Sequence, residues 1–408
     1  MLVRSRVVAA LEAKKDHFAS YQVELRDTLG RFWAALESLP SFSRAEIEAK
    51  FSEAEIVWPG ALPTSEQDRL HDTVIGAGQS WANHEDARAW AKEVLLNIPT
   101  FAVDGSQIPP SRDFSVPVGA VQVGWFENPH VPGGQYVKDL VFEVLAPDEL
   151  AEEAEGDVGG DFPDWRVNLR RFEMECQAVI EYMEAHAADG PGSPRSKKDG
   201  PDTAPLCFFD GSLVVSFAQH MRPNLRRRYV DAVTGMLRAS QACRVPLVGY
   251  VDTSFARDLV MMLINLCQLP YAPRMSDGAL LRPRMGWGDR SQVYICARDD
   301  KVLPEYGPHA RQVCFCYLKT TAEGAPARLE FPGWLAEDEV EMERTLNLVR
   351  AECIVGNGYP YALETADAVA VIGLRDRERF YTAFQRFAQK QGLALRYSRK
   401  ALSKRMRR

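Results

Sequence analysis

The sequence predicts an α/β protein with a mixed sheet flanked by helices and an N-terminal helical extension. Three observations lead to this fold class. Three extended segments separated by turn residues follow one another between residues 100 and 145, strands and helices alternate from residue 206 onward, and apolar residues recur at helical spacing before both. Of the 408 residues, 46% are hydrophobic and 26% charged, which fits a globular protein and excludes disorder as its main state.

The first 98 residues are expected to form a helical region that packs on the main domain. Apolar residues recur at helical spacing from Val3 to Leu39, and a second helical stretch runs from Glu66 to Asn97 and stops before Pro99. Two interpretations of the first helix stay open. It covers the chain's own sheet, or its amphipathic face binds a partner.

The main domain is expected at residues 99–395. It starts with a meander of three strands, Thr100–Val103, Val116–Phe126 and Tyr136–Leu145. An acidic loop at Asp148–Asp164, a helix at Trp165–Ala187 and a flexible insertion at 189–203 follow. Further strands are expected at Leu206–Phe209, Leu213–Phe217, Pro246–Val251, Gln292–Ala297, Val313–Lys319 and Ala327–Phe331. Further helices are expected at Pro223–Cys243, Ser254–Leu266, Glu337–Ile354, Tyr361–Ile372 and Asp376–Gln391.

Two segments place an aspartate at the end of an apolar strand. Phe101–Ser106 and Cys207–Ser212 both end in Asp-Gly-Ser and carry Asp104 and Asp210. Either copy alone is ordinary turn chemistry, but two copies at strand ends indicate carboxylates that meet. Two unit charges about 4 Å apart repel by roughly 4 kcal/mol at an effective dielectric of 20, so a cation is the usual companion. Oxygen ligands favour Mg²⁺ or Mn²⁺.

A third carboxylate, Asp367, lies in the segment Ala366–Ile372, which is otherwise made of Ala, Val and Ile, so it needs a partner there. The three segments together carry a resemblance. Phe-x-x-Asp-Gly-Ser at residues 101–106, Phe-Asp-Gly-Ser-Leu at 209–213 and Tyr-Pro-x-x-Leu-x-x-Ala-Asp at 359–367 resemble the NurA nucleases of prokaryotic DNA end resection. Lys-Thr before Ala-Arg-Leu-Glu-Phe-Pro at 319–332 and Tyr-Ser-Arg-Lys at 397–400 are similar to that family as well.

The resemblance implies an RNase H-like fold and a homodimeric nuclease that uses Mn²⁺, with Mg²⁺ as the alternative. The implied activities on DNA are 5′ to 3′ exonuclease and single-strand endonuclease, in double-strand break end resection with the hexameric HerA ATPase. Asp104 and Asp210 match the family's metal ligands, and Glu175 matches its helical glutamate, with Glu173 as a neighbouring alternative. Asp367 stands where many members carry His, so metal binding is expected there and proton transfer is in doubt.

The last thirteen residues form a basic tail within a chain whose net charge is −7. The tail is expected to contact DNA phosphates, and the alternative is a solvated terminus. Its expected DNA-binding residues are Arg396, Arg399, Lys400, Lys404 and Arg405. No apolar run suits a membrane span or a secretory leader, so a cytoplasmic protein with reduced cysteines and no membrane contact is expected.

Two other functional classes stay open. The chain could be a catalytically weakened adaptor that binds DNA ends and the ATPase ring, since Asp367 replaces the family's histidine. An actin-like phosphotransferase would need an Asp-x-Gly spacing that neither strand end has. The absence of a Walker A sequence means that ATP hydrolysis must come from a partner. The basic run Arg222–Arg228 could meet phosphates or simply form a solvated face.

Overall fold

The computed structural model describes residues 2–79, 81–111, 114–151, 164–187, 204–393 and 395. The chain divides into two compact units, Met1–Ser80 with Val251–Glu337, and Trp81–Tyr250 with Asp338–Arg408. The division expected from the sequence, at residues 98 and 395, stays a prediction. Most of the acidic loop, the insertion at 189–203 and the basic tail lie outside the described residues.

The first unit contains four antiparallel strands in the order β1 (Gly60–Pro63), β9 (Tyr294–Ala297), β10 (Val313–Leu318) and β11 (Ala327–Pro332). The short strands β2 (Val74–Ile75) and β8 (Arg290–Ser291) pair with each other, and β8 also pairs with β10. Its α-helices are α1 (Arg4–Glu12), α2 (Lys15–Ser38), α3 (Arg44–Glu53), α4 (Glu66–Arg69), α9 (Asp258–Cys267), α10 (Asp277–Leu281) and α11 (Gly333–Ala336). Its 3-10 turns are η1 (Leu39–Ser41), η4 (Arg282–Arg284) and η5 (Leu303–His309).

The N-terminal region is less helical than expected. The single helix predicted from Val3 to Leu39 is two helices, α1 and α2, and the stretch predicted from Glu66 to Asn97 contains β2 between α4 and α5 (His84–Leu95). The structure also contains a strand that the sequence does not predict, β1. It pairs with β9, which lies more than 230 residues further along the chain, so local sequence patterns do not reveal this partner. Among the described residues α1 has no buried residue, whereas Phe32 and Leu36 near the end of α2 are buried.

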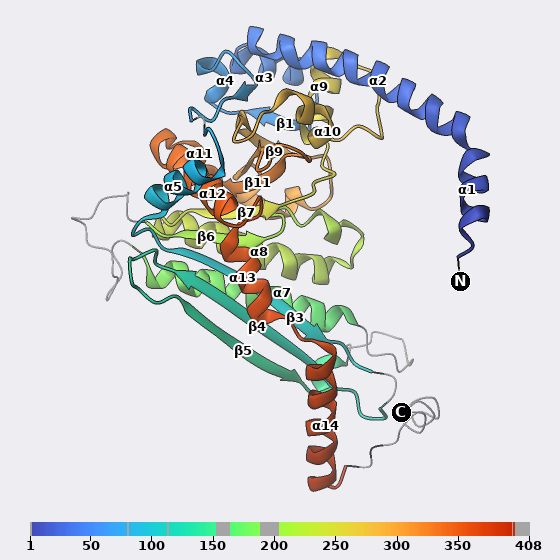
Figure 1. The fold of residues 1–408 in the computed structure, drawn as a ribbon, viewed down its shortest axis with the longest axis vertical. Helices are drawn as coiled ribbons and strands as arrows, with labels where there is room; N and C mark the ends of the chain where they lie inside the picture. Colours follow the sequence, from blue (N-terminus) through green and yellow to red (C-terminus); the bar gives the residue numbers. More distant parts are fainter. Residues whose placement is uncertain are drawn as a thin grey trace. The chain divides into compact units, whose positions relative to one another are not determined.

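The second unit has the strand order of an RNase H-like fold. Figure 1 shows its strands β5 (Val137–Leu145), β4 (Gly119–Asn128), β3 (Thr100–Ile108), β6 (Leu206–Asp210) and β7 (Leu247–Val251), which lie side by side in that order. The first three are antiparallel, and β6 and β7 run parallel to β3. The mixed sheet flanked by helices that the sequence predicts is therefore confirmed.

Five helices of this unit agree closely with the expected ranges: α7 (Asp164–Ala185), α8 (Pro223–Cys243), α12 (Glu339–Val355), α13 (Tyr361–Ala370) and α14 (Leu374–Lys390). The short helix α6 (Pro147–Leu150) lies at the start of the segment expected to be an acidic loop and was not predicted. The strand predicted at Leu213–Phe217 is wrong. Gly211, with a φ of 138°, turns the chain out of the sheet directly after β6, and a loop and the 3-10 turn η3 (Ser216–His220) follow.

All eight cysteines are free thiols, seven of them buried, as expected for a reduced protein. Within the part of the chain that the structure describes, no helix is long and apolar enough to cross a membrane.

Candidate active site

Asp104 and Asp210 come together because their strands are parallel neighbours in register. Val103 pairs with Phe209, so the aspartate that follows each of them occupies the same step of adjacent strands. Their carboxylates lie close enough for the charge of Asp210 to raise the pKa of Asp104. The meeting point expected from the two Asp-Gly-Ser segments is therefore present in the fold.

Helix α7 brings Glu175 to the same place through a gap left by Gly105. A Cβ atom on Gly105 would collide with Oε1 of Glu175 and would lie 2.8 Å from Cγ of Arg171. Arg171 Nη1 donates to Glu175 Oε1 at 2.6 Å and to the Gly105 carbonyl oxygen at 3.3 Å. The glycine after Asp104 thus permits α7 to approach, which the turn interpretation of Asp-Gly-Ser did not anticipate.

The neighbouring Glu173 points elsewhere. Arg228 of α8 donates to both of its carboxylate oxygens at 2.7 Å, from Nε and Nη2. Of the two glutamates considered from the sequence, Glu175 is therefore the one whose charge acts on the aspartate pair.

Helix α13 carries Asp367 to Asp104 from the other face of the sheet. Gly124 of β4 pairs with Asp104, and a Cβ atom on Gly124 would lie 2.8 Å from Val369 Cγ1 and 2.9 Å from the Ala370 backbone nitrogen. Because successive side chains on a strand face opposite ways, Asp104 faces α13 while Gly105 faces α7. Asp104 and Asp367 are within hydrogen-bonding reach when one of them is protonated.

A buried glutamate on α12 ties α13 to the start of β3. Glu352 Oε1 accepts from the Thr100 hydroxyl at 2.9 Å, and its Oε2 accepts from the Ala362 backbone N–H in the first turn of α13 at 2.9 Å. His130 Nε2 lies 3.5 Å from Glu352 Oε1. Since β3 carries Asp104 and α13 carries Asp367, this carboxylate sets the register between them. The sequence analysis missed Glu352, although a charged residue within Ala351–Ile354 is a signal of a buried polar contact.

The site is electrostatically strained without a cation. Burial raises the pKa of Asp104 to about 6, helped by the hydrogen bond to Asp367 and the charge of Asp210, and opposed by the Gly105 N–H. Burial also raises the pKa of Glu175 to about 7, opposed by Arg171 and assisted by Asp104 and Asp210. Near neutral pH, Asp104 and Glu175 are therefore only partly ionised. A positive charge placed beside them would stabilise their ionised forms.

The donor set fits a hard divalent cation in its chemistry, because every contributing group is a carboxylate oxygen. Among the described residues, however, no three acidic, histidine or cysteine side chains are close enough to hold a metal ion as they stand. The geometry explains this: Glu175 is held by Arg171 on one face of the sheet, and Asp367 reaches Asp104 from the other. Side-chain rotation would have to bring the oxygens onto one ion.

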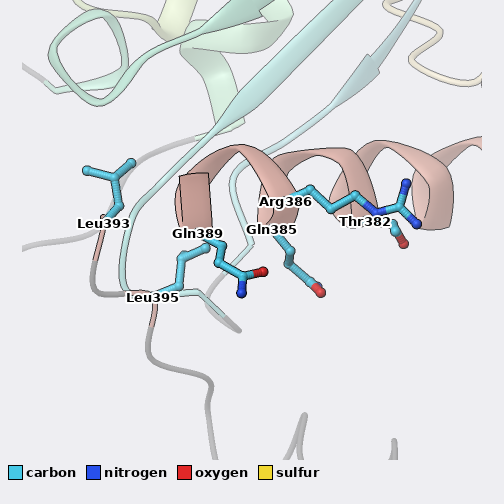
Figure 2. Close-up of a pocket in the computed structure, with 6 residues that line it drawn as sticks. All are labelled: Thr382, Gln385, Arg386, Gln389, Leu393 and Leu395. Atoms are coloured by element: carbon cyan, nitrogen blue, oxygen red, sulfur yellow. The ribbon is translucent and has the colours of Figure 1, made fainter. Parts of the chain in front are cut away.

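The predicted DNA-binding residues Arg396, Arg399, Lys400, Lys404 and Arg405 lie outside the described residues. The chain leading to them lines a hollow on α14, where Figure 2 shows Arg386 and Gln389 projecting from the helix. The hollow is completed by Thr382, Gln385, Leu393 and Leu395. None of the four site carboxylates lines this hollow.

Comparison with known proteins gives one family. The model of the NurA domain matches residues 99–372, which is more than half of the chain. A crystal structure of the NurA nuclease from Sulfolobus solfataricus is similar at 16% identity and a TM-score of 0.45, covering 72% of this chain and 85% of that one. A crystal structure of NurA with manganese is similar at 9% identity and a TM-score of 0.38, covering 68% of this chain and 87% of that one. The catalytic domain of human endonuclease V is similar at 14% identity and a TM-score of 0.30, covering 80% of this chain and 95% of that one. No curated protein matches.

The sheet order and the acidic side chains on its central parallel strands place the protein in the class of RNase H-like α/β folds with a carboxylate site. The match to the family model then gives the particular family. This chain belongs to the NurA family, as its motifs indicated.

Proposed function

We propose that this chain is a divalent-metal-dependent DNA nuclease that resects double-strand break ends, with 5′ to 3′ exonuclease and single-strand endonuclease activity. The observation that carries the proposal is the group of carboxylates from β3, β6, α7 and α13, in which burial, assisted by neighbouring carboxylates, raises the pKa values of Asp104 and Glu175. Such a group is costly to a fold unless it serves a cation or a reaction.

Asp104, Asp210, Glu175 and Asp367 would hold one or two Mn²⁺ ions, with Mg²⁺ as the alternative. When bound, the cation supplies positive charge that activates water and stabilises the phosphoryl oxygens. Arg171 orients Glu175 and favours its ionised form, since its charge opposes the rise of the Glu175 pKa. Asp367 can share a proton with Asp104 but, unlike histidine, cannot alternate between neutral and cationic forms.

The test is cleavage of labelled single- and double-stranded DNA with Mn²⁺. Asp104→Asn and Asp210→Asn should each abolish cleavage while leaving the circular dichroism spectrum intact. Glu175→Gln should do the same, and Glu173→Gln on the same helix is its matched control because Glu173 is paired with Arg228. Undiminished Mn²⁺-dependent cleavage by both aspartate variants would overturn the assignment.

A second candidate is an adaptor that binds DNA ends without cutting them. It is favoured by Asp367 in place of the family's histidine and by the lack of a preassembled metal group among the described residues. Binding of labelled DNA with no cleavage under Mn²⁺, Mg²⁺ or Ca²⁺ would support the adaptor over the nuclease.

The homodimer is proposed to form through β5. This strand ends the order of paired strands, and its exposed side chains are largely apolar. The apolar ones are Tyr136 just before the strand and Val137, Leu140, Val141, Phe142 and Val144 within it, and the charged ones are Lys138 and Asp139. An open edge strand pairs best with an identical strand related by a two-fold axis. Light scattering should give a dimer at micromolar concentration, and Val141→Lys should give a monomer.

The hexameric HerA-type ATPase is proposed to bind the N-terminal helices. α1 and the start of α2 expose apolar residues at helical spacing, among them Val7, Leu11 and Phe18. Leu11→Glu should abolish co-elution with the ATPase and leave Mn²⁺-dependent cleavage unchanged. Co-elution of this variant would contradict the assignment of the surface. We place the complex in the cytoplasm, where the free thiols stay reduced.

A further inference from the structure

Four aromatic rings form a cluster beside the carboxylates, which we call the aromatic cluster. Phe172 of α7 lies 5.8 Å from Phe209, 6.3 Å from Phe217 and 5.0 Å from Tyr229, measured between ring centroids. Phe217 and Tyr229 are 5.1 Å apart. All four contacts are edge-to-face, the geometry that aromatic pairs prefer.

The aromatic cluster is joined to the carboxylate group by the chain itself. Phe209 directly precedes Asp210 on β6, and Phe172 lies one turn before Glu175 on the same face of α7. The aromatic cluster therefore adjoins Glu175 along α7, and β6 runs from the cluster directly into Asp210.

One member of the cluster is open to solvent. Phe172, Phe209 and Tyr229 are buried, whereas Phe217 is 57% exposed. The ring of Phe217 packs against Phe172 and Tyr229. The backbone that follows it is held by Arg226, whose Nη1 donates to the carbonyls of Gln219 and Met221 at 3.4 Å. An exposed ring held by a buried aromatic base is a preorganised stacking surface.

The segment next to Phe217 is cationic. Arg222 is the N-cap residue of α8, Pro223 is its first residue, and the first turn holds no acidic residue. Arg227 reaches Asp231 at 3.7 Å with its side chain 79% exposed, a pair that stabilises little. Arg228 by contrast is held by Glu173. Positive charge at this helix start complements phosphate, in a chain that is otherwise acidic.

We propose that η3 and the start of α8 form a single-strand platform, on which Phe217 stacks against a DNA base while Arg222 and Arg227 contact the flanking phosphates. The inference rests on the proposed nuclease function and names its substrate class. Bases in a duplex are stacked on each other, so only a single strand can offer a base face to the ring. The platform would thus present a single strand to Asp210 and Glu175.

The experiment measures binding of a fluorescent oligonucleotide in EDTA, where no cleavage occurs. Phe217→Leu keeps the apolar volume and loses the flat ring, and we expect it to weaken single-strand binding about five- to a hundredfold. Phe217→Trp should restore it. Phe387→Ala, at a residue on α14 that is 54% exposed, is the matched control and should bind as the parent does.

An abasic scan shows whether the ring meets a base. One abasic position in the oligonucleotide should weaken binding to the parent protein and have no further effect on Phe217→Leu, whereas duplex affinity should be equal for both. Arg227→Ala should flatten the salt dependence of log K for single strands by about 0.7. Arg379→Ala is its control, because Arg379 is 80% exposed and lies 3.1 Å from Asp376.

The results separate this inference from the proposed function. Equal single-strand affinity of Phe217→Leu and the parent overturns the platform, and if both cleave DNA with Mn²⁺ the nuclease function stands. Equal losses on single strands and duplex also overturn it, since they indicate a packing defect. A parent that neither binds nor cleaves DNA overturns both.

Discussion

Removing the charge of Asp104 should make the metal-free protein more stable while it abolishes cleavage. Burial and the neighbouring carboxylates raise the pKa of Asp104 from 3.8 to about 6, so ionising this group in the folded state costs free energy. A shift of about two units corresponds to a ceiling of roughly 3 kcal/mol at 1.36 kcal/mol per unit. Because the side chain is partly exposed, solvent screening reduces the expected effect to about 1–2 kcal/mol.

The sign of the pH dependence follows from the raised pKa. Between pH 3.8 and about 6 the folded state binds more protons than the unfolded state, so the contribution of Asp104 to stability falls as pH rises through that window. Above it the destabilisation is complete. Asp104→Asn cannot ionise, so its advantage over the parent should be largest at pH 8, should shrink as pH falls below about 6 and should vanish only below pH 3.8.

The assay is urea unfolding in EDTA at pH 8 and pH 4.5, followed by circular dichroism with equal m-values required. Adding Mn²⁺ at pH 8 should raise the stability of the parent and leave that of Asp104→Asn unchanged. The reasoning is refuted if the variant is less stable than the parent at pH 8 without metal, or if the difference is the same at both pH values.

The remaining predictions concern the elements around the carboxylates. Gly105→Ala should lower cleavage at least tenfold and cost about 1–3 kcal/mol, measured by urea unfolding, because its Cβ would displace Glu175; parental activity would contradict the close approach of α7. Glu352→Ala should cost about 3 kcal/mol in the same assay, since the Thr100 hydroxyl and the Ala362 N–H lose their acceptor, and Glu352→Gln should cost clearly less. Truncation after Leu395 should flatten the salt slope of DNA binding by a few units in an anisotropy titration; an unchanged slope would show that the basic tail does not contact phosphates.

The sequence predicts the parts of this fold that local pattern encodes. α8 was predicted at its observed bounds because Pro223 opens it and apolar residues repeat along it, and the aspartate pair could be expected because strand-end motifs recur. The strand predicted at Leu213–Phe217 fails because Gly211 turns the chain out of the sheet, so that Leu213, Val214 and Val215 are buried in a loop and Phe217 lies in η3. β1 was missed because its partner β9 is distant in the chain.

The sequence motifs name the four carboxylates of the candidate site but not the residues that support them. Asp210 and Asp367 each interact with Asp104, and Glu175 interacts with Asp104 and Asp210, while their roles as metal ligands stay a prediction. Gly124 and Glu352 were not named, because what they do depends on packing of α13 that no short-range pattern reveals. A glycine inside a strand is, in hindsight, the available signal of close backbone approach.

The interleaving of the two units affects when the carboxylate group can assemble during translation. Asp104, Glu175 and Asp210 lie in the first stretch of the second unit, whereas Glu352 and Asp367 lie in its second stretch, after the whole of Val251–Glu337. A nascent chain emerging from the ribosome at about 5–20 residues per second exposes three of the four acidic groups many seconds before the fourth. The newborn chain therefore cannot complete this group of acids until synthesis of the other unit has finished.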